Sequence, residues 1–163
     1  MMREASPFVS RLRAAFPPDP IDVAGAFDER GGSYPDAEPY ERALDGKTWE
    51  QLDHAYVARR SDALSFLGTR HLIAVLPVYL ELLFELGPRS PVPETLLPLL
   101  TRPEAGKAMQ VKRFDAFTAG LSPAQRAVVA DALARFVVEF PAYGPPAQLA
   151  LDRHWTAFRE GIK

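Results

Sequence analysis

The chain has 163 residues, of which 47% are hydrophobic and 25% are charged, and its formal net charge is -2. This length fits one domain, and this balance of apolar and charged residues excludes a chain that is disordered over most of its length. The small net charge argues against nucleic acid or an anionic membrane surface as a partner, because clustered Lys and Arg drive binding to both.

The composition also indicates a compartment and an origin. Cysteine is absent, which removes disulfides, thiolate metal sites and cysteine nucleophiles. Charges interrupt residues 1–16, so we expect no signal peptide and a cytoplasmic location. Most of the 19 basic residues are arginine, and alanine and proline are abundant, as is typical of a GC-rich bacterial genome.

The first helix is predicted near the N-terminus. Ser6 followed by Pro7 is a favourable N-cap and first-turn pair. Phe8, Leu12 and Phe16 then recur every four residues, which places them on one face of a helix. Two consecutive prolines end this helix, and a short helix or turn is expected at residues 21–27.

An acidic loop that contains Gly and Pro is predicted at residues 28–38, because this segment lacks any apolar period. A short helix over residues 40–44 follows and is closed by Gly46. Thr48 and Gln51 then form the sequence of a capping box, which predicts a helix that continues through Tyr56.

Residues 70–86 are predicted to be the central helix, because apolar side chains surround this segment almost completely. Glu81 and Glu85 interrupt its apolar run, which is also too short to span a bilayer. Pro77 lies inside it and removes the hydrogen bond to the Ile73 carbonyl, at a cost of about 3 kcal/mol, so we expect a kink there.

The second half of the chain is also predicted to be helical. Ser122, Pro123 and Gln125 form a second capping box that opens a long helix. No segment alternates strictly between apolar and polar residues, so little or no sheet is expected. The sequence therefore predicts one all-α domain over residues 1–163, a compact irregular bundle of about six to eight helices. The helices expected after the central one cover residues 96–100, 111–117, 122–140 and 149–162.

No catalytic or cofactor motif withstands inspection. The run from Asp45 to Thr48 is similar to the end of a phosphate-binding loop, but Glu41 occupies the place of the first glycine and no strand precedes it. The serine-hydrolase patterns Gly-x-Ser-x-Gly and Ser-x-x-Lys are absent. The chain also lacks the basic recognition face of a DNA-binding helix. We therefore assign no catalytic residue and no cofactor.

Metal binding is the one chemical alternative that the residues suggest. Glu50 and His54 are four residues apart, so both could face one ion from a single helix, with Asp53 adjacent. Asp152 and His154 in the tail are further candidate ligands. Two ligands do not make a site, and the spacings His-Glu-x-x-His and Glu-x-x-His are absent, so we predict no metal site and interpret these residues as solvated or capping groups.

The uneven distribution of charge is the most suggestive feature. Residues 28–53 contain eight acidic residues and three basic ones, with tyrosines between them. Acidic surface with exposed tyrosine suits docking onto a basic protein, because charge steers the encounter and an aromatic ring anchors it. A solvated loop is the simpler interpretation. The predicted partner-binding residues are Asp28, Glu29, Tyr34, Asp36, Glu38 and Tyr40.

Four short motifs follow one another in order along residues 45–140. They are Gly46-Lys47-x-Trp49, Leu64-Ser65-Phe66-Leu67, Leu76-Pro77-x-Tyr79-Leu80 and Leu121-Ser122-Pro123-x-Gln125-Arg126. In these motifs the chain resembles an uncharacterised bacterial helical family, the domain of unknown function 6714. The resemblance implies a small helical bacterial domain and brings no activity, cofactor or catalytic residue.

Three hypotheses of function follow. The first is a non-catalytic domain that binds another protein, as an immunity-type inhibitor or an adaptor. The second is an enzyme with an unrecognised, metal-assisted site that uses Glu50, Asp53 and His54. The third is a small-molecule sensor with a pocket near Pro77.

Overall fold

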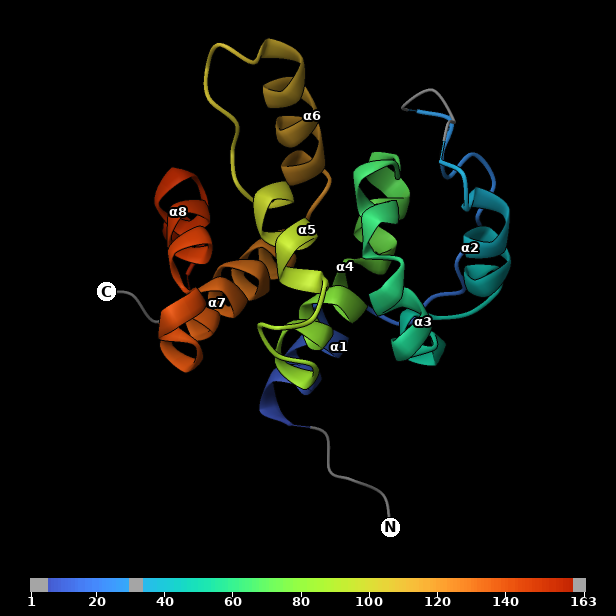
Figure 1. Cartoon of the computed structure of the whole chain (residues 1–163), viewed down its shortest axis with the longest axis horizontal. Helices are drawn as coiled ribbons and strands as arrows, with labels where there is room; N and C mark the ends of the chain where they lie inside the picture. Colours follow the sequence, from blue (N-terminus) through green and yellow to red (C-terminus); the bar gives the residue numbers. More distant parts are fainter. Residues whose placement is uncertain (1–5, 30–33, 160–163) are drawn as a thin grey trace.

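The computed structural model describes residues 6–29 and 34–159, and within these residues it contains eight α-helices and no strand (Figure 1). The predicted all-α class is confirmed. Four short 3-10 helices complete the structure: η1 (Trp49–Gln51), η2 (Ser61–Ser65), η3 (Pro141–Tyr143) and η4 (Trp155–Phe158). The α-helices are α1 (Pro7–Ala15), α2 (Ala37–Leu44), α3 (His54–Arg59), α4 (Thr69–Glu85), α5 (Val92–Leu99), α6 (Ala108–Ala119), α7 (Pro123–Glu139) and α8 (Pro145–Arg153).

Helix α4 occupies the middle of the bundle, with α2 and α3 on one side and α7 and α8 on the other (Figure 1). It contacts α1, α3, α5, α6 and α7, and ten of its 17 residues are buried. A helix covered on so many sides has to be apolar nearly all round, and this confirms the central helix predicted over 70–86. Pro77 lies inside α4, which continues through it, and the kink stays a prediction.

The core is one cluster of buried apolar side chains that extends from Phe8 in α1 to Trp155 in η4. Trp155 is fully buried, and its Nε1 donates a hydrogen bond to the Leu100 carbonyl at 2.6 Å. This bond ties the last helical turn to the end of α5. Within the described ranges, no helix has both the length and the apolar character that crossing a membrane requires.

The capping signals at Ser6 and Ser122 act as predicted. Ser6 Oγ accepts a hydrogen bond from the Val9 N–H at 3.2 Å. Ser122 Oγ accepts from the Gln125 N–H at 3.1 Å, and Gln125 Oε1 accepts from the Ser122 N–H at 2.9 Å. Each pair satisfies backbone donors that a helix end would otherwise leave without partners.

The predicted helix from Thr48 through Tyr56 is wrong. Gln51 Oε1 accepts from the Thr48 N–H at 3.0 Å, but the helix that follows is the single turn η1. Leu52 is extended, with φ -69° and ψ 142°, and buries its side chain. Asp53 then caps a separate helix, α3. The burial of the Leu52 side chain and the new N-cap at Asp53 outweigh the helix propensity of these residues, so the helix does not continue past η1.

Two other predicted boundaries also move. Helix α2 begins at Ala37, inside the predicted 28–38 loop, and Gly46 follows its end with the positive φ of +73° that favours glycine. Residues 30–33 of that loop lie outside the described residues. The predicted tail helix over 149–162 is replaced by α8 and η4, with Ile162 outside the described residues.

The N-terminal end of α4 is capped by a segment about forty residues earlier in the chain. The Gly68 N–H donates to the Ala26 carbonyl at 3.0 Å, and the Thr69 N–H donates to Glu29 Oε2 at 2.8 Å. The acidic side chain is also favourable at this positive end of the helix dipole. Glu29, predicted to bind a partner, therefore has a structural role in closing α4 against residues 21–29.

Candidate metal centre

The three residues that the sequence offers as metal ligands do not converge. Asp53 Oδ1 accepts the hydrogen bond from the Tyr56 N–H at 3.1 Å that caps α3. Glu50 Oε1 accepts from Arg13 Nε at 2.5 Å. Both carboxylates have structural partners, and among the described residues neither belongs to a group of three or more ligand atoms close enough to hold one ion.

The two tail residues also have other surroundings. Asp152 Oδ1 accepts from Gln148 Nε2 at 2.8 Å. His154 lies among aromatic rings, with its ring centre 4.8 Å from that of Trp155. Burial lowers the pKa of the His154 imidazole, as expected for a ring held among apolar groups.

His54 instead meets two carboxylates of the central helix. Glu81 and Glu85 are four residues apart on α4 and share one face, and His54 is the first residue of α3, which packs on α4. His54 Nδ1 lies 2.6 Å from Glu85 Oε2, and Nε2 lies 3.9 Å from Glu81 Oε2. One ligand atom from each side chain lies within 4.8 Å of the other two. The fold thus gathers one nitrogen and two oxygens of the kinds that bind metals.

The metal cluster, defined as His54, Glu81 and Glu85, is partly shielded from solvent. The side chains of His54 and Glu81 are 29% and 23% exposed, and that of Glu85 is 46% exposed. Burial raises the pKa of the Glu81 carboxyl, and the negative charges of Glu85 and Glu50 raise it further, against the opposing effects of His54 and Arg13. The positive charges near Glu81 therefore do not fully offset its burial and the negative charges around it.

The cluster lines a pocket of about 350 Å³ between α1, α3, α4 and α7. Phe8, Phe84 and Arg135 form other parts of its wall. The Arg135 guanidinium carbon lies 4.2 Å from the centre of the Phe84 ring, and its Nε donates to Glu139 Oε1 at 2.8 Å. The three candidate ligand residues therefore line the same pocket as the aromatic rings of Phe8 and Phe84 and the Arg135 cation.

This arrangement suits a divalent transition metal. Zinc is bound by imidazole nitrogen and carboxylate oxygen at about 2.0–2.2 Å, and two carboxylates with a neutral imidazole offset its double positive charge. Because His54 Nδ1 and Glu85 share a proton in their hydrogen bond, an ion bound there would displace that proton. Three protein ligands leave a fourth position on a tetrahedral ion for water or a ligand.

The sequence contained part of the signal for this cluster. Glu81 and Glu85 are the only charged residues within the apolar run of the central helix, and carboxylates that border an apolar core generally have a partner. The missing step was the identity of the partner, His54, which lies 27 residues before Glu81 in the chain. Only the packing of α3 on α4 brings them together.

The two tyrosines predicted to anchor a partner are buried, so the expectation that they are exposed is wrong. Tyr34 is 5% exposed and donates from its hydroxyl to Asp62 Oδ1 at 3.0 Å. Tyr40 is fully buried, and its hydroxyl lies 3.1 Å from that of Tyr79. Tyr79 in turn donates to the Val57 carbonyl at 2.9 Å, so Tyr40 is the donor between the two hydroxyls. These tyrosines join α2 to α3 and α4.

The predicted acidic residues remain at the surface. Asp28, Glu29 and Glu38 are exposed, and Asp36 is half-buried. Glu38 Oε1 accepts from Arg42 at 2.7 Å within α2, and Glu29 closes α4. The acidic side chains of residues 28–38 are therefore accessible to a partner, but the rings of Tyr34 and Tyr40 are not.

Comparisons with protein-family models, with curated proteins and with solved structures found no match for this chain. The resemblance to the helical family of unknown function stays a prediction, and the assignment of function depends on the geometry described above.

Proposed function

We propose that this protein binds one divalent transition-metal ion, with zinc as the reference ion, through His54, Glu81 and Glu85. The observation that carries this proposal is the convergence of three ligand atoms within 4.8 Å of one another at the wall of a pocket. The ligands come from two packed helices, so their separation is set by the core rather than by a loop.

An ion held by these three residues would have a chemical use, because three protein ligands would leave room beside it for a water molecule or an anionic group. A zinc ion with three protein ligands holds a water molecule or an anionic group at that position and acts on it as a Lewis acid. The aromatic and cationic wall at Phe84 and Arg135 borders the same opening. Metal-assisted chemistry on a small ligand is therefore the reaction class that this site favours.

A zinc titration of the full-length protein tests the proposal. We expect the metal-free protein to bind one Zn²⁺ with a dissociation constant on the order of 1 μM, measured by calorimetry or competition with a chromophoric chelator. His54→Ala and Glu81→Gln should each weaken binding at least about tenfold, because each removes a direct ligand. Proton release on binding, seen as a dependence of the heat on the buffer, should accompany it.

Glu50→Gln is the matched control, because it neutralises a nearby carboxylate that belongs to an ion pair with Arg13 rather than to the cluster. Its zinc affinity should stay within about twofold of the unmodified protein, since it alters only a longer-range charge. The proposal would be contradicted if the unmodified protein showed no saturable zinc binding, or if His54→Ala bound zinc as tightly as the unmodified protein. Loss of binding in Glu50→Gln alone would instead favour the set suggested by the sequence.

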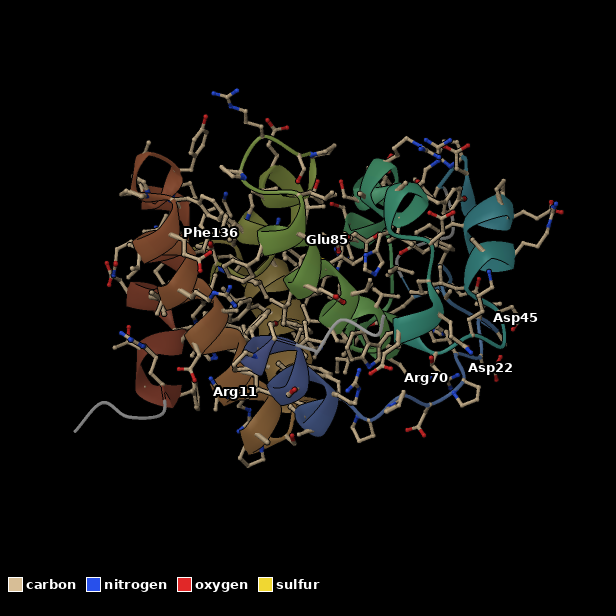
Figure 2. All side chains as sticks on the ribbon, turned by 90° about the horizontal axis from the view of Figure 1, so that it is seen from below. Arg11, Asp22, Asp45, Arg70, Glu85 and Phe136 are labelled. Carbon is tan, nitrogen blue, oxygen red and sulfur yellow. The ribbon has the colours of Figure 1, made fainter. Side chains whose placement is uncertain are left out.

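A second proposed function is docking onto a basic protein in the bacterial cytoplasm, as an immunity-type inhibitor or an adaptor. The observation that favours it is the acidic surface of α2 and its flanking segments, where Asp28, Glu38 and Asp45 are exposed. Asp45 lies at an outer edge of the molecule (Figure 2).

Charge reversal tests this second function. A partner recovered on the tagged protein should dissociate at about 0.5 M salt, because salt screens the exposed charges that guide such docking. It should also be lost from the triple variant that combines Asp28→Lys, Glu38→Lys and Asp45→Lys. Asp152→Lys on α8 is the control, and it should retain the partner. A partner that tolerates both the salt and the triple variant would count against this function.

A further inference from the structure

Arg135 of α7 lies in the wall of the pocket that also contains the metal cluster. Its guanidinium carbon lies 4.2 Å from the centre of the Phe84 ring and 5.0 Å from that of the Phe8 ring. These two rings meet edge to face, with their centres 5.1 Å apart. Contacts of this length between a cation and an aromatic ring are attractive. The guanidinium is therefore held against two other side chains of the same pocket.

Helical spacing puts this guanidinium on the side of α4 that carries the metal cluster. Phe84 is three residues after Glu81 and next to Glu85, and residues three or four apart share one face of a helix. The ring over which Arg135 lies therefore belongs to the same face as both carboxylates. Among the described residues, no ion pair joins Arg135 to Glu81 or Glu85. The cation and the candidate ligand atoms thus line one pocket without being paired to each other.

Arg135 retains most of its capacity to donate hydrogen bonds. A guanidinium donates from Nε and from both terminal nitrogens, Nη1 and Nη2. Arg135 Nε donates to Glu139 Oε1 at 2.8 Å, whereas Nη1 and Nη2 have no hydrogen-bond partner within residues 6–29 and 34–159. The Arg135 side chain is 38% exposed, so a ligand can reach these terminal donors. Their planar arrangement is the one that binds a carboxylate through two parallel hydrogen bonds.

The charges of the pocket favour an anion only when a metal ion is bound. Without an ion, Glu81 and Glu85 contribute two negative charges, and the one positive charge of Arg135 is itself paired with Glu139. A divalent cation offsets the charges of the two carboxylates that bind it. The terminal donors of Arg135 then remain available to an anion that the carboxylates no longer repel.

We infer, on the basis of the proposed metal site, that the metal-loaded pocket binds a small carboxylate with an apolar body, and that Arg135 holds the carboxylate beside the ion. Phe8, Val9 and Phe84 supply apolar wall for the body of such a ligand. The volume of about 350 Å³ is at the lower end of the range of small-molecule sites, which limits the body to about one ring. The positive ion and the guanidinium together select a carboxylate over a neutral group of the same shape.

Titration of the zinc-loaded, full-length protein with phenylacetate tests this inference. This ligand has one aromatic ring and one carboxylate, and we expect saturable binding with a dissociation constant on the order of 1 mM, measured by calorimetry. Phenylacetamide has nearly the same shape without the charge, and acetate has the charge without the ring. Each should bind at least about tenfold more weakly, because each lacks one of the two contacts that the pocket offers.

The dependence on the metal locates the carboxylate. The metal-free protein should bind phenylacetate at least about tenfold more weakly than the zinc-loaded protein, because Glu81 and Glu85 then repel the anion. Binding equilibria are reciprocal, so saturating phenylacetate should tighten zinc binding by the same factor. The zinc titration is corrected for association of free zinc with phenylacetate in the buffer.

Variants of Arg135 test the donor. Arg135→Gln should weaken the binding of phenylacetate to the zinc-loaded protein at least about tenfold, and Arg135→Lys, which keeps the charge but not the planar fork, should recover only part of the affinity. Arg42→Gln is the matched control, because Arg42 also forms an ion pair with a residue four positions away but lies on α2, outside the pocket. It should stay within about twofold of the unmodified protein. Each variant is saturated with zinc before the titration, and circular dichroism confirms its fold.

The outcomes separate this inference from the proposed metal function. A protein that binds no zinc would overturn both. Zinc binding without saturable phenylacetate binding up to about 10 mM would overturn this inference alone. So would phenylacetamide binding as tightly as phenylacetate, or undiminished binding by folded, zinc-loaded Arg135→Gln. Equal affinity of the metal-free and zinc-loaded proteins for phenylacetate would show that the carboxylate does not lie beside the ion, and would also overturn it.

Discussion

Replacing Trp155 with alanine should destabilise the protein by about 3–5 kcal/mol, the range for removing a fully buried aromatic side chain. Trp155 has no exposed surface, and its Nε1 donates to the Leu100 carbonyl. The substitution leaves a cavity between α5 and the C-terminal turn and also leaves that carbonyl without its donor. Denaturation by urea, followed by far-UV circular dichroism, measures the loss of unfolding free energy.

Val138→Ala is the matched control, because the Val138 side chain is 80% exposed on α7. It should change the unfolding free energy by less than about 0.5 kcal/mol. A loss of under about 1 kcal/mol for Trp155→Ala would show that the tail contributes little to the core.

Tyr79→Phe should destabilise the protein by about 1–3 kcal/mol, although it removes a single oxygen atom. The Tyr79 hydroxyl donates to the Val57 carbonyl and accepts from the Tyr40 hydroxyl, and both tyrosines are fully buried. Its removal leaves the buried Tyr40 hydroxyl without a partner, at a cost of about 1–3 kcal/mol, and takes one of two donors from the Val57 carbonyl, which still accepts from the Arg60 N–H at 3.2 Å. Burial raises the pKa of both tyrosines, so both hydroxyls stay protonated and able to donate.

Tyr40→Phe supplies the comparison. It removes a donor to Tyr79 but leaves the bond from Tyr79 to Val57, so we expect a smaller loss, about 1 kcal/mol. In the double variant the two effects should not add, and the difference of about 1 kcal/mol is the coupling between the hydroxyls. Strict additivity in chemical denaturation would mean that the two hydroxyls act independently.

Helices with purely local signals could be predicted from the sequence. The capping box at Ser122 and Gln125 and the apolar period beyond it define α7, because both the cap and the face depend on residues within a few positions. The central position of α4 was likewise predictable, since a helix that is apolar all round has to be covered.

Features that depend on packing between distant segments could not be predicted. The end of η1 at Leu52 follows from burial of that side chain, which no local propensity encodes. The same holds for Tyr34 and Tyr40, which looked like exposed anchors among acidic residues and proved to be core residues. A tyrosine in a polar segment can be buried when the fold provides apolar neighbours for its ring and a hydrogen-bond partner for its hydroxyl. Both depend on segments that are distant in the sequence.

The candidate sites also combine features that the local sequence indicates with features that only the packing of distant segments creates. His54 was recognisable as a possible ligand, but its partners Glu81 and Glu85 belong to another helix, and only the packing of α3 on α4 brings them to it. A pocket near Pro77 was anticipated from the proline alone. The structure has a pocket lined by Pro77, and tertiary contacts build its wall, since the side chains of Trp49, His71 and Gln125 each donate to a carbonyl within residues 15–22.

The closure of α4 by Ala26 and Glu29 bears on how the chain folds. The first amides of any helix have no acceptor within it, and at the start of α4 two of them donate to Ala26 and Glu29, about forty residues earlier in the chain. The start of α4 is therefore complete only when residues 26–29 are docked against it, a contact between distant segments of the kind that slows folding. A nick within residues 21–29 would loosen the start of the central helix and, through it, the wall around Pro77.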